Sequence, residues 1–154
     1  NDKPQTPLPK VEGLRVGIVV AEWNAHVTEA LLAGALEVFK NEGYLIENVL
    51  VEHVPGTVEL TYGASRMMRM PVDAVIVFGC VIRGGTPHFD YVCDSVTQGV
   101  AQLNALGTKP VVFGVLTTDN EEQAVERAGG ALGNKGSEAA EVAIKMVDFS
   151  RRIG

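Results

Sequence analysis

The sequence predicts an α/β protein with a single domain, in which a four-stranded parallel sheet lies between two layers of helices in a three-layer sandwich. Short β-branched apolar runs alternate four times with segments of helical periodicity, which favours parallel strands joined by right-handed crossovers. A chain of 154 residues with 46% hydrophobic residues has the size of one ordinary domain. No repeat or change of composition divides the chain.

The first strand and helix follow an N-terminal segment without periodicity. Residues 1–10 contain three prolines, and we expect them to form an extended arm ahead of a domain at residues 11–154. The run RVGIVVA at residues 15–21 is typical of a strand buried on both faces. Apolar side chains at helical spacing over residues 27–42 predict a helix that ends at Gly43.

The middle of the chain predicts two further strands, each followed by a helix. Residues 45–54 predict the second strand, and a proline–glycine break separates it from a helix over residues 57–69. The run DAVIVFG at residues 73–79 predicts the third strand, again buried on both faces. Apolar side chains at helical spacing from Pro87 onward predict the next helix.

The last part of the chain predicts one strand and two helices. The run PVVFGVL at residues 110–116 predicts the fourth strand. Thr118 to Glu121 match a capping box, the pattern of side chains that satisfies the free backbone N–H groups where a helix begins. A glycine-rich bend at residues 129–136 leads into a final helix over residues 137–152.

Charge and cysteine content exclude several classes of partner. The net charge of −6 and a pI near 5 give no electrostatic surface for nucleic acid or for an anionic membrane. The longest apolar run, residues 74–82, is too short to cross a bilayer, and no leader segment is visible, so we expect a cytoplasmic protein. We interpret Cys80 and Cys93 as buried free thiols, with a disulfide or a metal site as the alternatives.

The unusual residues of the chain follow the predicted strands. In open parallel sheets, ligands bind beyond the carboxyl ends of the strands. The segments at those ends are Trp23-Asn24, PGTVE at 55–59, VIRGGTPH at 81–88 and LTTDN at 116–120. We therefore expect the functional site at this edge.

The segment after the third strand has the features of an anion site. Thr86 can cap the helix and Pro87 suits its first position, while Gly84 and Gly85 allow a ligand to approach the backbone closely. A helix start of this kind binds phosphate, and the absence of GxGxxG and GxxxxGK[ST] patterns favours a small monophosphate over a nucleotide. His88 would lie beside that anion, where an imidazole can take or give a proton near pH 7.

The same residues also suit a purely structural helix start. In that interpretation the glycines and Thr86 only form the turn, and His88 is a residue of the first helical turn. Arg83, at the end of a strand, is more often the ion-pair partner of an acid than a ligand for substrate.

Six motifs together resemble the lumazine synthase family, and the resemblance covers residues 13 to about 150. The motifs are EWNAHVT at 22–28, PGTVEL at 55–60, VIRGGTPHFDYV at 81–92, FGVLTTDN at 113–120, EQAVERAG at 122–129 and GNKGSEAAEVA at 133–143. The resemblance implies a flavodoxin-like fold with the strand order 2-1-3-4. It also implies the condensation of 5-amino-6-(D-ribitylamino)uracil with 3,4-dihydroxy-2-butanone 4-phosphate to 6,7-dimethyl-8-ribityllumazine. It implies no metal and no organic cofactor, and a functional link to riboflavin synthase.

The resemblance also assigns roles to particular residues. It makes His88 the proton-transfer residue, and it assigns the phosphate to Gly85, Thr86 and Arg127. The residues it assigns to the pyrimidine and its ribityl chain are Trp23, Asn24, Thr57, Val58, Glu59, Cys80, Val81, Ile82, Phe113 and Lys135. Family members form pentamers, some of which build a shell of sixty chains, and Phe113 and Lys135 are implied to complete the site of a neighbouring subunit.

Alternatives remain open for several of these residues. Taken alone, Arg127 suits an i,i+4 partner on its own helix, Trp23 a core side chain, and Glu59 a carboxylate at a helix start. Gly85 and Val58 depart from the residues most common in the family, which affects the expected affinity more than the activity. An FMN-binding module and an inactive shell protein are the competing functions, and the bulky loop AEWNAHVT disfavours the first.

Overall fold

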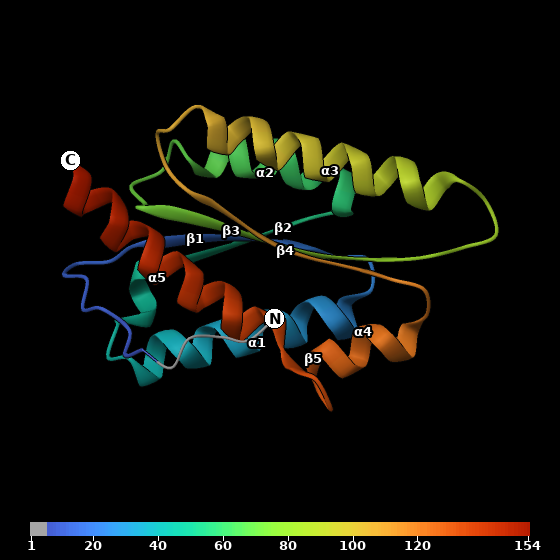
Figure 1. Cartoon of the computed structure of the whole chain (residues 1–154), viewed down its shortest axis with the longest axis horizontal. Helices are drawn as coiled ribbons and strands as arrows, with labels where there is room; N and C mark the ends of the chain where they lie inside the picture. Colours follow the sequence, from blue (N-terminus) through green and yellow to red (C-terminus); the bar gives the residue numbers. More distant parts are fainter. Residues whose placement is uncertain (1–5) are drawn as a thin grey trace.

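The computed structural model describes residues 6–154, so residues 1–5 of the expected arm lie outside the described part (Figure 1). A four-stranded parallel sheet with the order β2-β1-β3-β4 forms its centre, as predicted. The strands are Val16–Ala21 (β1), Val49–Val54 (β2), Ala74–Ile82 (β3) and Val111–Thr118 (β4). Since all four strands run the same way, their carboxyl ends meet at one edge of the sheet.

Helices cover both faces of the sheet, which confirms the three-layer prediction (Figure 1). One layer contains α1 (Ala25–Asn41), α4 (Glu121–Arg127) and α5 (Lys135–Ile153), and the other contains α2 (Leu60–Met67) and α3 (His88–Ala105). The side chains of β1 alternate between the two cores: Ile18 and Val20 pack toward α1 and α5, whereas Val19 packs toward α2.

Several predicted boundaries are wrong, and a contact between distant parts of the chain explains those of β3 and β4, which ends at Thr118, two residues beyond its predicted end. β3 runs three residues beyond the predicted end, since its pairing with β4 continues from Val75–Val111 to Ile82–Thr118. Residues 46–48 form a short 3₁₀ turn, so β2 begins only at Val49. The helix predicted over residues 57–69 is a 3₁₀ turn at Thr57–Glu59 followed by α2.

The predicted glycine-rich bend is a tight antiparallel hairpin. Its strands are Ala128–Gly130 (β5) and Gly133–Asn134 (β6), and Gly129 and Gly133 have φ values of 105° and 83°. These left-handed values favour glycine over residues with a side chain. The hairpin places the start of α5 directly beside α1.

The helix α5 begins two residues earlier than predicted because Asn134 caps it. The Asn134 side chain accepts hydrogen bonds from the backbone of Gly136 and Ser137 at 2.7 and 3.3 Å, and its Nδ2 donates to the Ala30 carbonyl of α1 at 3.1 Å. One side chain thus starts α5 and attaches it to α1. Lys135 is the first residue of this anchored helix.

The described residues of the predicted arm, 6–10, have no regular secondary structure. Leu8 packs against the core between the sheet and α1, and the Lys10 Nζ lies 3.5 Å from the Glu42 carbonyl oxygen. Residues from Leu8 onward therefore contact their own domain. Among the described helices, none combines the length and the apolar character needed to cross a membrane.

Candidate functional site at the carboxyl edge of the sheet

Backbone hydrogen bonds join the loops at the carboxyl edge to one another. The amides of Glu22 and Trp23, after β1, donate to the carbonyls of Val54, the last residue of β2, and Pro55, at 2.8 and 3.0 Å. The amide of Arg83, after β3, donates to the Thr118 carbonyl of β4 at 2.8 Å. The segments predicted to carry function are therefore held together.

Trp23 lies on the surface and is not a core side chain. It is 69% exposed, and its ring packs over Gly56, where an added Cβ would come within 2.7 Å of the indole. The next residue, Asn24, adopts a left-handed conformation with φ 62° and ψ 43°. Its Nδ2 donates to the Cys80 carbonyl at 3.0 Å. The turn after β1 therefore presents an apolar aromatic face beside the end of β3.

The segment Thr57–Glu59 lies next to the same strand end. Thr57 is buried and packs against Gly79, whose added Cβ would lie 2.8 Å from the Thr57 Oγ1. Val58 is exposed, as a residue in contact with a ligand would be. The Glu59 Oε1 accepts a hydrogen bond from the Gly56 amide at 2.9 Å, so this carboxylate already supports the turn, as the structural alternative expected.

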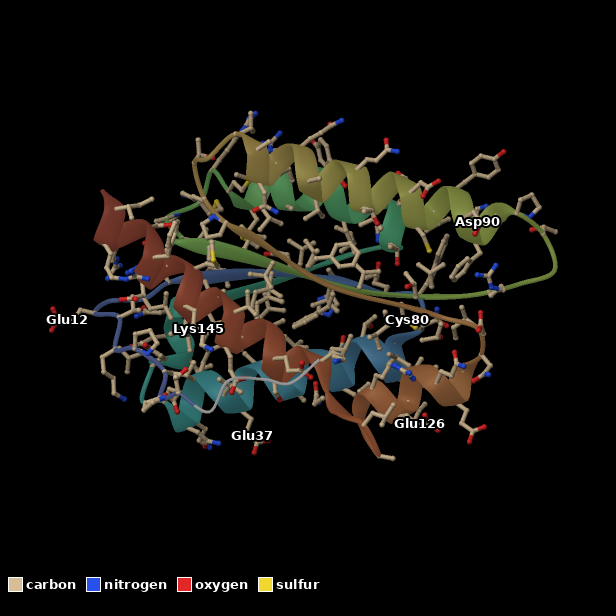
Figure 2. The ribbon with its side chains drawn as sticks, viewed as in Figure 1. Glu12, Glu37, Cys80, Asp90, Glu126 and Lys145 are labelled. Carbon is tan, nitrogen blue, oxygen red and sulfur yellow. The ribbon has the colours of Figure 1, made fainter. Side chains whose placement is uncertain are left out.

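The end of β3 contributes backbone groups and a buried thiol. Cys80, Val81 and Ile82 pair with β4, and Cys80 lies in the interior behind the loops (Figure 2). Burial raises the pKa of the Cys80 thiol to about 11, and the negative charge of Glu121 adds to the shift. Both cysteines are free thiols, as predicted, but only Cys80 is buried and Cys93 is partly exposed. Cys80 is protonated at neutral pH and thus a poor nucleophile.

The loop from β3 to α3 is open to solvent. Cβ atoms added at Gly84 and Gly85 would meet nothing within 4 Å, so a ligand has room beside the backbone. Thr86 is predicted to cap α3, but the helix begins at His88 and Pro87 holds the cap position. The Thr86 Oγ1 accepts only a long hydrogen bond, 3.4 Å, from the His88 amide. His88 is exposed at the start of α3, next to this loop.

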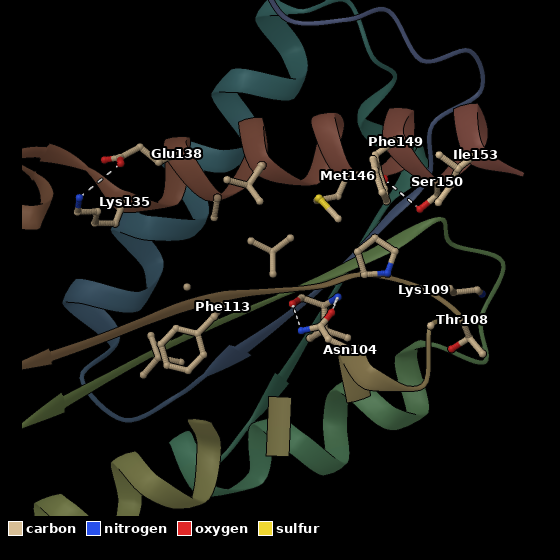
Figure 3. A pocket seen from close by; sticks show the side chains of 18 of the residues that line it. Asn104, Thr108, Lys109, Phe113, Lys135, Glu138, Met146, Phe149, Ser150 and Ile153 are labelled. Carbon is tan, nitrogen blue, oxygen red and sulfur yellow. Dashed lines mark hydrogen bonds and ion pairs between the residues drawn. The ribbon is translucent and has the colours of Figure 1, made fainter. Parts of the chain in front are cut away.

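Phe113 and Lys135 lie apart from the residues described so far. Both line a groove of about 830 Å³ between the open edge of β4 and α5, and Figure 3 shows the two side chains toward one end of it. The Lys135 Nζ lies 3.4 Å from the Glu138 Oε1, which also lines the groove. No residue from the loops after β1, β2 or β3 lines it. Apart from Arg127, the predicted site residues thus form two groups within one chain.

Arg127, the last residue of α4, belongs to the layer opposite α3 (Figure 1). Its Nη1 donates to the Gln123 carbonyl at 2.8 Å and lies 3.9 Å from the Glu126 carboxylate. These are the contacts along its own helix that the structural alternative expected. Within the described residues, no hydrogen bond or ion pair joins Arg127 to the loop at 84–88.

Two side chains near the site were missed by the sequence prediction. Glu138 shares the groove with Lys135, and its position three residues later on a helix is the signal that could have identified it. Asn120 caps α4 in place of Thr118, since its side chain accepts from the Gln123 amide at 2.9 Å. Within residues 6–154, no three His, Cys, Asp or Glu side chains gather as metal ligands would.

Comparisons with known proteins agree on one family. The family model of 6,7-dimethyl-8-ribityllumazine synthase matches residues 13–151. A protein of that name from Bacteroides fragilis is 60% identical over 137 residues, which cover 88% of this chain and 96% of the relative. Proteins of the same name from Phocaeicola vulgatus and Porphyromonas gingivalis are each 54% identical, over 95% and 94% of this chain and 88% and 90% of the relatives.

Proposed function

Since this chain belongs to the 6,7-dimethyl-8-ribityllumazine synthase family, we propose that it performs the family's reaction at the carboxyl edge of the sheet, with His88 as the proton-transfer residue. The enzyme condenses 5-amino-6-(D-ribitylamino)uracil with 3,4-dihydroxy-2-butanone 4-phosphate and releases phosphate and water, the penultimate step of riboflavin biosynthesis. The observation that supports the proposed site most directly is the open glycine loop that leads into α3, with His88 exposed at its end.

The reaction requires a proton shuttle and a clamp for the leaving phosphate. An amine attacks a ketone to give an imine, phosphate then leaves, and a ring closes, so positioning and electrostatic stabilisation dominate. Gly85 and Thr86 offer backbone groups near the start of α3, and Arg127 supplies a guanidinium suited to two parallel hydrogen bonds. His88 moves protons between the amine and the oxygen atoms that leave.

The pyrimidine and its ribityl chain have their own proposed contacts. The exposed indole of Trp23 stacks on the pyrimidine, and the backbone of Cys80–Ile82 meets its polar edge. The remaining proposed contacts are Asn24, Thr57, Val58 and Glu59, together with Phe113 and Lys135 of an adjacent subunit. The two groups of side chains found within one chain support such a shared site.

We further propose a pentamer that associates into a shell of sixty chains. No extra residues lengthen the connection between α4 and α5, which folds as a tight hairpin. A connection this short leaves room for neighbouring pentamers to pack against one another. Sedimentation separates the two assemblies, because the shell has twelve times the mass of the pentamer. A single species of pentamer mass would contradict the shell.

Residues 1–10 are proposed as an arm outside the catalytic domain at 11–154, and a chain without them is expected to stay active, since no proposed site residue lies there. The two free thiols favour a cytoplasmic location, because such thiols persist in reducing compartments. Riboflavin synthase is the proposed functional partner, as the enzyme that consumes the product.

The proposed site is tested by replacing His88 with alanine. We expect kcat to fall by about one to two orders of magnitude, the lower part of the range for a positioned acid–base group, since the condensation also proceeds slowly unaided. His53→Ala is the matched control, because His53 is an exposed histidine on β2 that pairs with Glu29 at 2.8 Å. An unchanged rate for His88→Ala, with both variants folded, would remove His88 from the mechanism.

A further inference from the structure

Arg83 makes three contacts around the loop that precedes His88. Its amide donates to the Thr118 carbonyl at 2.8 Å, and its Nε donates to the Asp119 Oδ1 at 2.9 Å. The Cζ atom of its guanidinium lies 4.4 Å from the centre of the Phe89 ring. Arg83 therefore attaches the end of β3 to β4 and at the same time covers the residue after His88.

These contacts are the main restraints on a loop that is otherwise free. The five residues from 84 to 88 are exposed, and Gly84 and Gly85 have no neighbours that a Cβ would meet. The only hydrogen bond described for the side chains and amides of this segment, from the His88 amide to the Thr86 Oγ1, stays within it. Two consecutive glycines give such a loop many conformations unless its ends are fixed. The guanidinium fixes both ends, because it contacts Asp119 on one side and Phe89 on the other.

Two carboxylates lie near the guanidinium of Arg83, and Asp119 interacts with it more strongly than Asp90 does. The hydrogen bond to Asp119 raises the pKa of Arg83, and the charge of Asp90 adds a smaller contribution from 3.9 Å. Asp119 is itself held in place, since its amide donates to the Gln123 Oε1 at 2.8 Å. The residue that anchors Arg83 thus has its backbone held by a side chain of α4.

We propose that Arg83 is a positioning residue for the condensation, which holds the loop Gly84–His88 so that its backbone meets the phosphate and the imidazole meets the reacting atoms. The inference rests on the proposed function, because it assigns the phosphate and the proton transfer to this loop. Arg83 acts through the loop and through Phe89, and it does not need to touch the substrate.

The variants Arg83→Gln and Asp119→Asn test this role. We expect Arg83→Gln to raise the KM for the butanone phosphate, and the inhibition constant of inorganic phosphate as its competitor, by about tenfold, since small displacements of positioning groups have effects of this size or larger. The KM for the pyrimidine should change less than twofold, because Trp23 and Thr57–Glu59 do not depend on Arg83. Arg83→Lys should restore part of the loss, since it keeps the charge without the planar guanidinium.

Asp119→Asn distinguishes positioning from direct binding of phosphate by Arg83. Positioning predicts that this variant weakens phosphate binding in the same direction as Arg83→Gln, and that the double variant is no worse than the more impaired single one. Direct binding predicts the opposite, because losing a nearby negative charge would leave phosphate affinity unchanged or improve it. That second result would overturn the inference.

Arg152→Gln is the matched control. Arg152 has the same kinds of contact near the end of α5, with its Nε 2.9 Å from the Asp148 carboxylate and its Cζ 5.8 Å from the Phe149 ring centre. If the inhibition constant of phosphate is the same for Arg83→Gln and Arg152→Gln, the positioning role of Arg83 is overturned. The proposed site itself then still stands, provided that His88→Ala is impaired and wild type is inhibited by phosphate. If wild type is insensitive to phosphate and His88→Ala is fully active, both the proposed site and this inference fail. Thermal unfolding of each variant establishes that it is folded.

Discussion

At the scale of single residues, the Cys80 thiol gives the protein a response to alkaline pH. Burial, aided by the charge of Glu121, raises the pKa of this thiol from 9.0 to about 11. The folded protein therefore favours the neutral thiol. The contribution of this thiol to the free energy of unfolding is fully present below pH 9 and is lost as the pH rises from 9 to about 11. We expect the unfolding temperature of wild type to fall more steeply over this interval than that of Cys80→Ala.

Cys80→Ala also loses buried volume at every pH, so the change of the unfolding temperature with pH, and not the temperature itself, reports on the thiol. Other groups that titrate in this interval, such as lysine and tyrosine side chains, are common to both proteins and cancel. Cys93→Ala is a suitable control, since the pKa of Cys93 is also raised by burial but its side chain is only partly buried. Parallel curves for wild type and Cys80→Ala would contradict a raised pKa at this site.

At the scale of elements, the crossing of α1 and α5 depends on one glycine. A Cβ added at Gly136 would collide with the backbone of Leu31, including its carbonyl oxygen, and backbone cannot turn aside as a flexible side chain can. Ser137 reinforces the crossing, since its Oγ donates to the Gly34 carbonyl at 3.2 Å. Gly136→Ala must therefore separate the two helices.

We expect Gly136→Ala to lower the free energy of unfolding by about 3 kcal/mol, as overpacking of a close contact does. Urea unfolding followed by circular dichroism measures this loss. Ser150→Ala on the same helix is the control, because its exposed hydroxyl bonds only to the Met146 carbonyl, and a change within about 0.5 kcal/mol is expected. Equal stability of the two variants would show that the helices can separate without penalty.

The order of the elements could be predicted from the sequence, but some of their ends could not. The central strands β1 and β3 are found where their apolar runs lie, because strands covered on both faces need continuous apolar sequence. The end of β3 depends instead on its pairing with Thr118, and the attachment of α5 to α1 on a hydrogen bond from Asn134 to Ala30. Both partners are distant in sequence, so local patterns carry no information about them.

Part of the candidate site could also be predicted from the sequence. The glycine loop before His88 carries a local signal, because helix starts and close backbone approaches demand particular residues. Arg83 is ambiguous from the sequence alone, since its partner Asp119 lies 36 residues away in the loop after β4. The separation of Phe113 from the loop at 84–88 depends on the place of β4 at the edge of the sheet, which no local pattern encodes.

At the scale of the whole molecule, the open edge of β4 leaves an apolar surface uncovered. Phe113 on this strand is 43% exposed, and α5 presents a stripe of apolar side chains to the same groove: Val142, Met146, Phe149 and Ile153. Single chains in water seldom leave an edge strand and an apolar groove side by side without a cover. The proposed oligomer would cover both.

The division of the proposed site residues between the strand-end loops and the β4 groove would allow two defective alleles to complement each other. A His88→Ala chain keeps an intact Phe113 and Lys135, whereas a Lys135→Ala chain keeps an intact loop and His88. If each site joins the loop of one subunit to the groove of the next, rings assembled at random from equal amounts of both chains contain about one quarter intact sites. Two proteins of reduced activity would then regain activity when they are unfolded and refolded together, but not when they are mixed as finished rings.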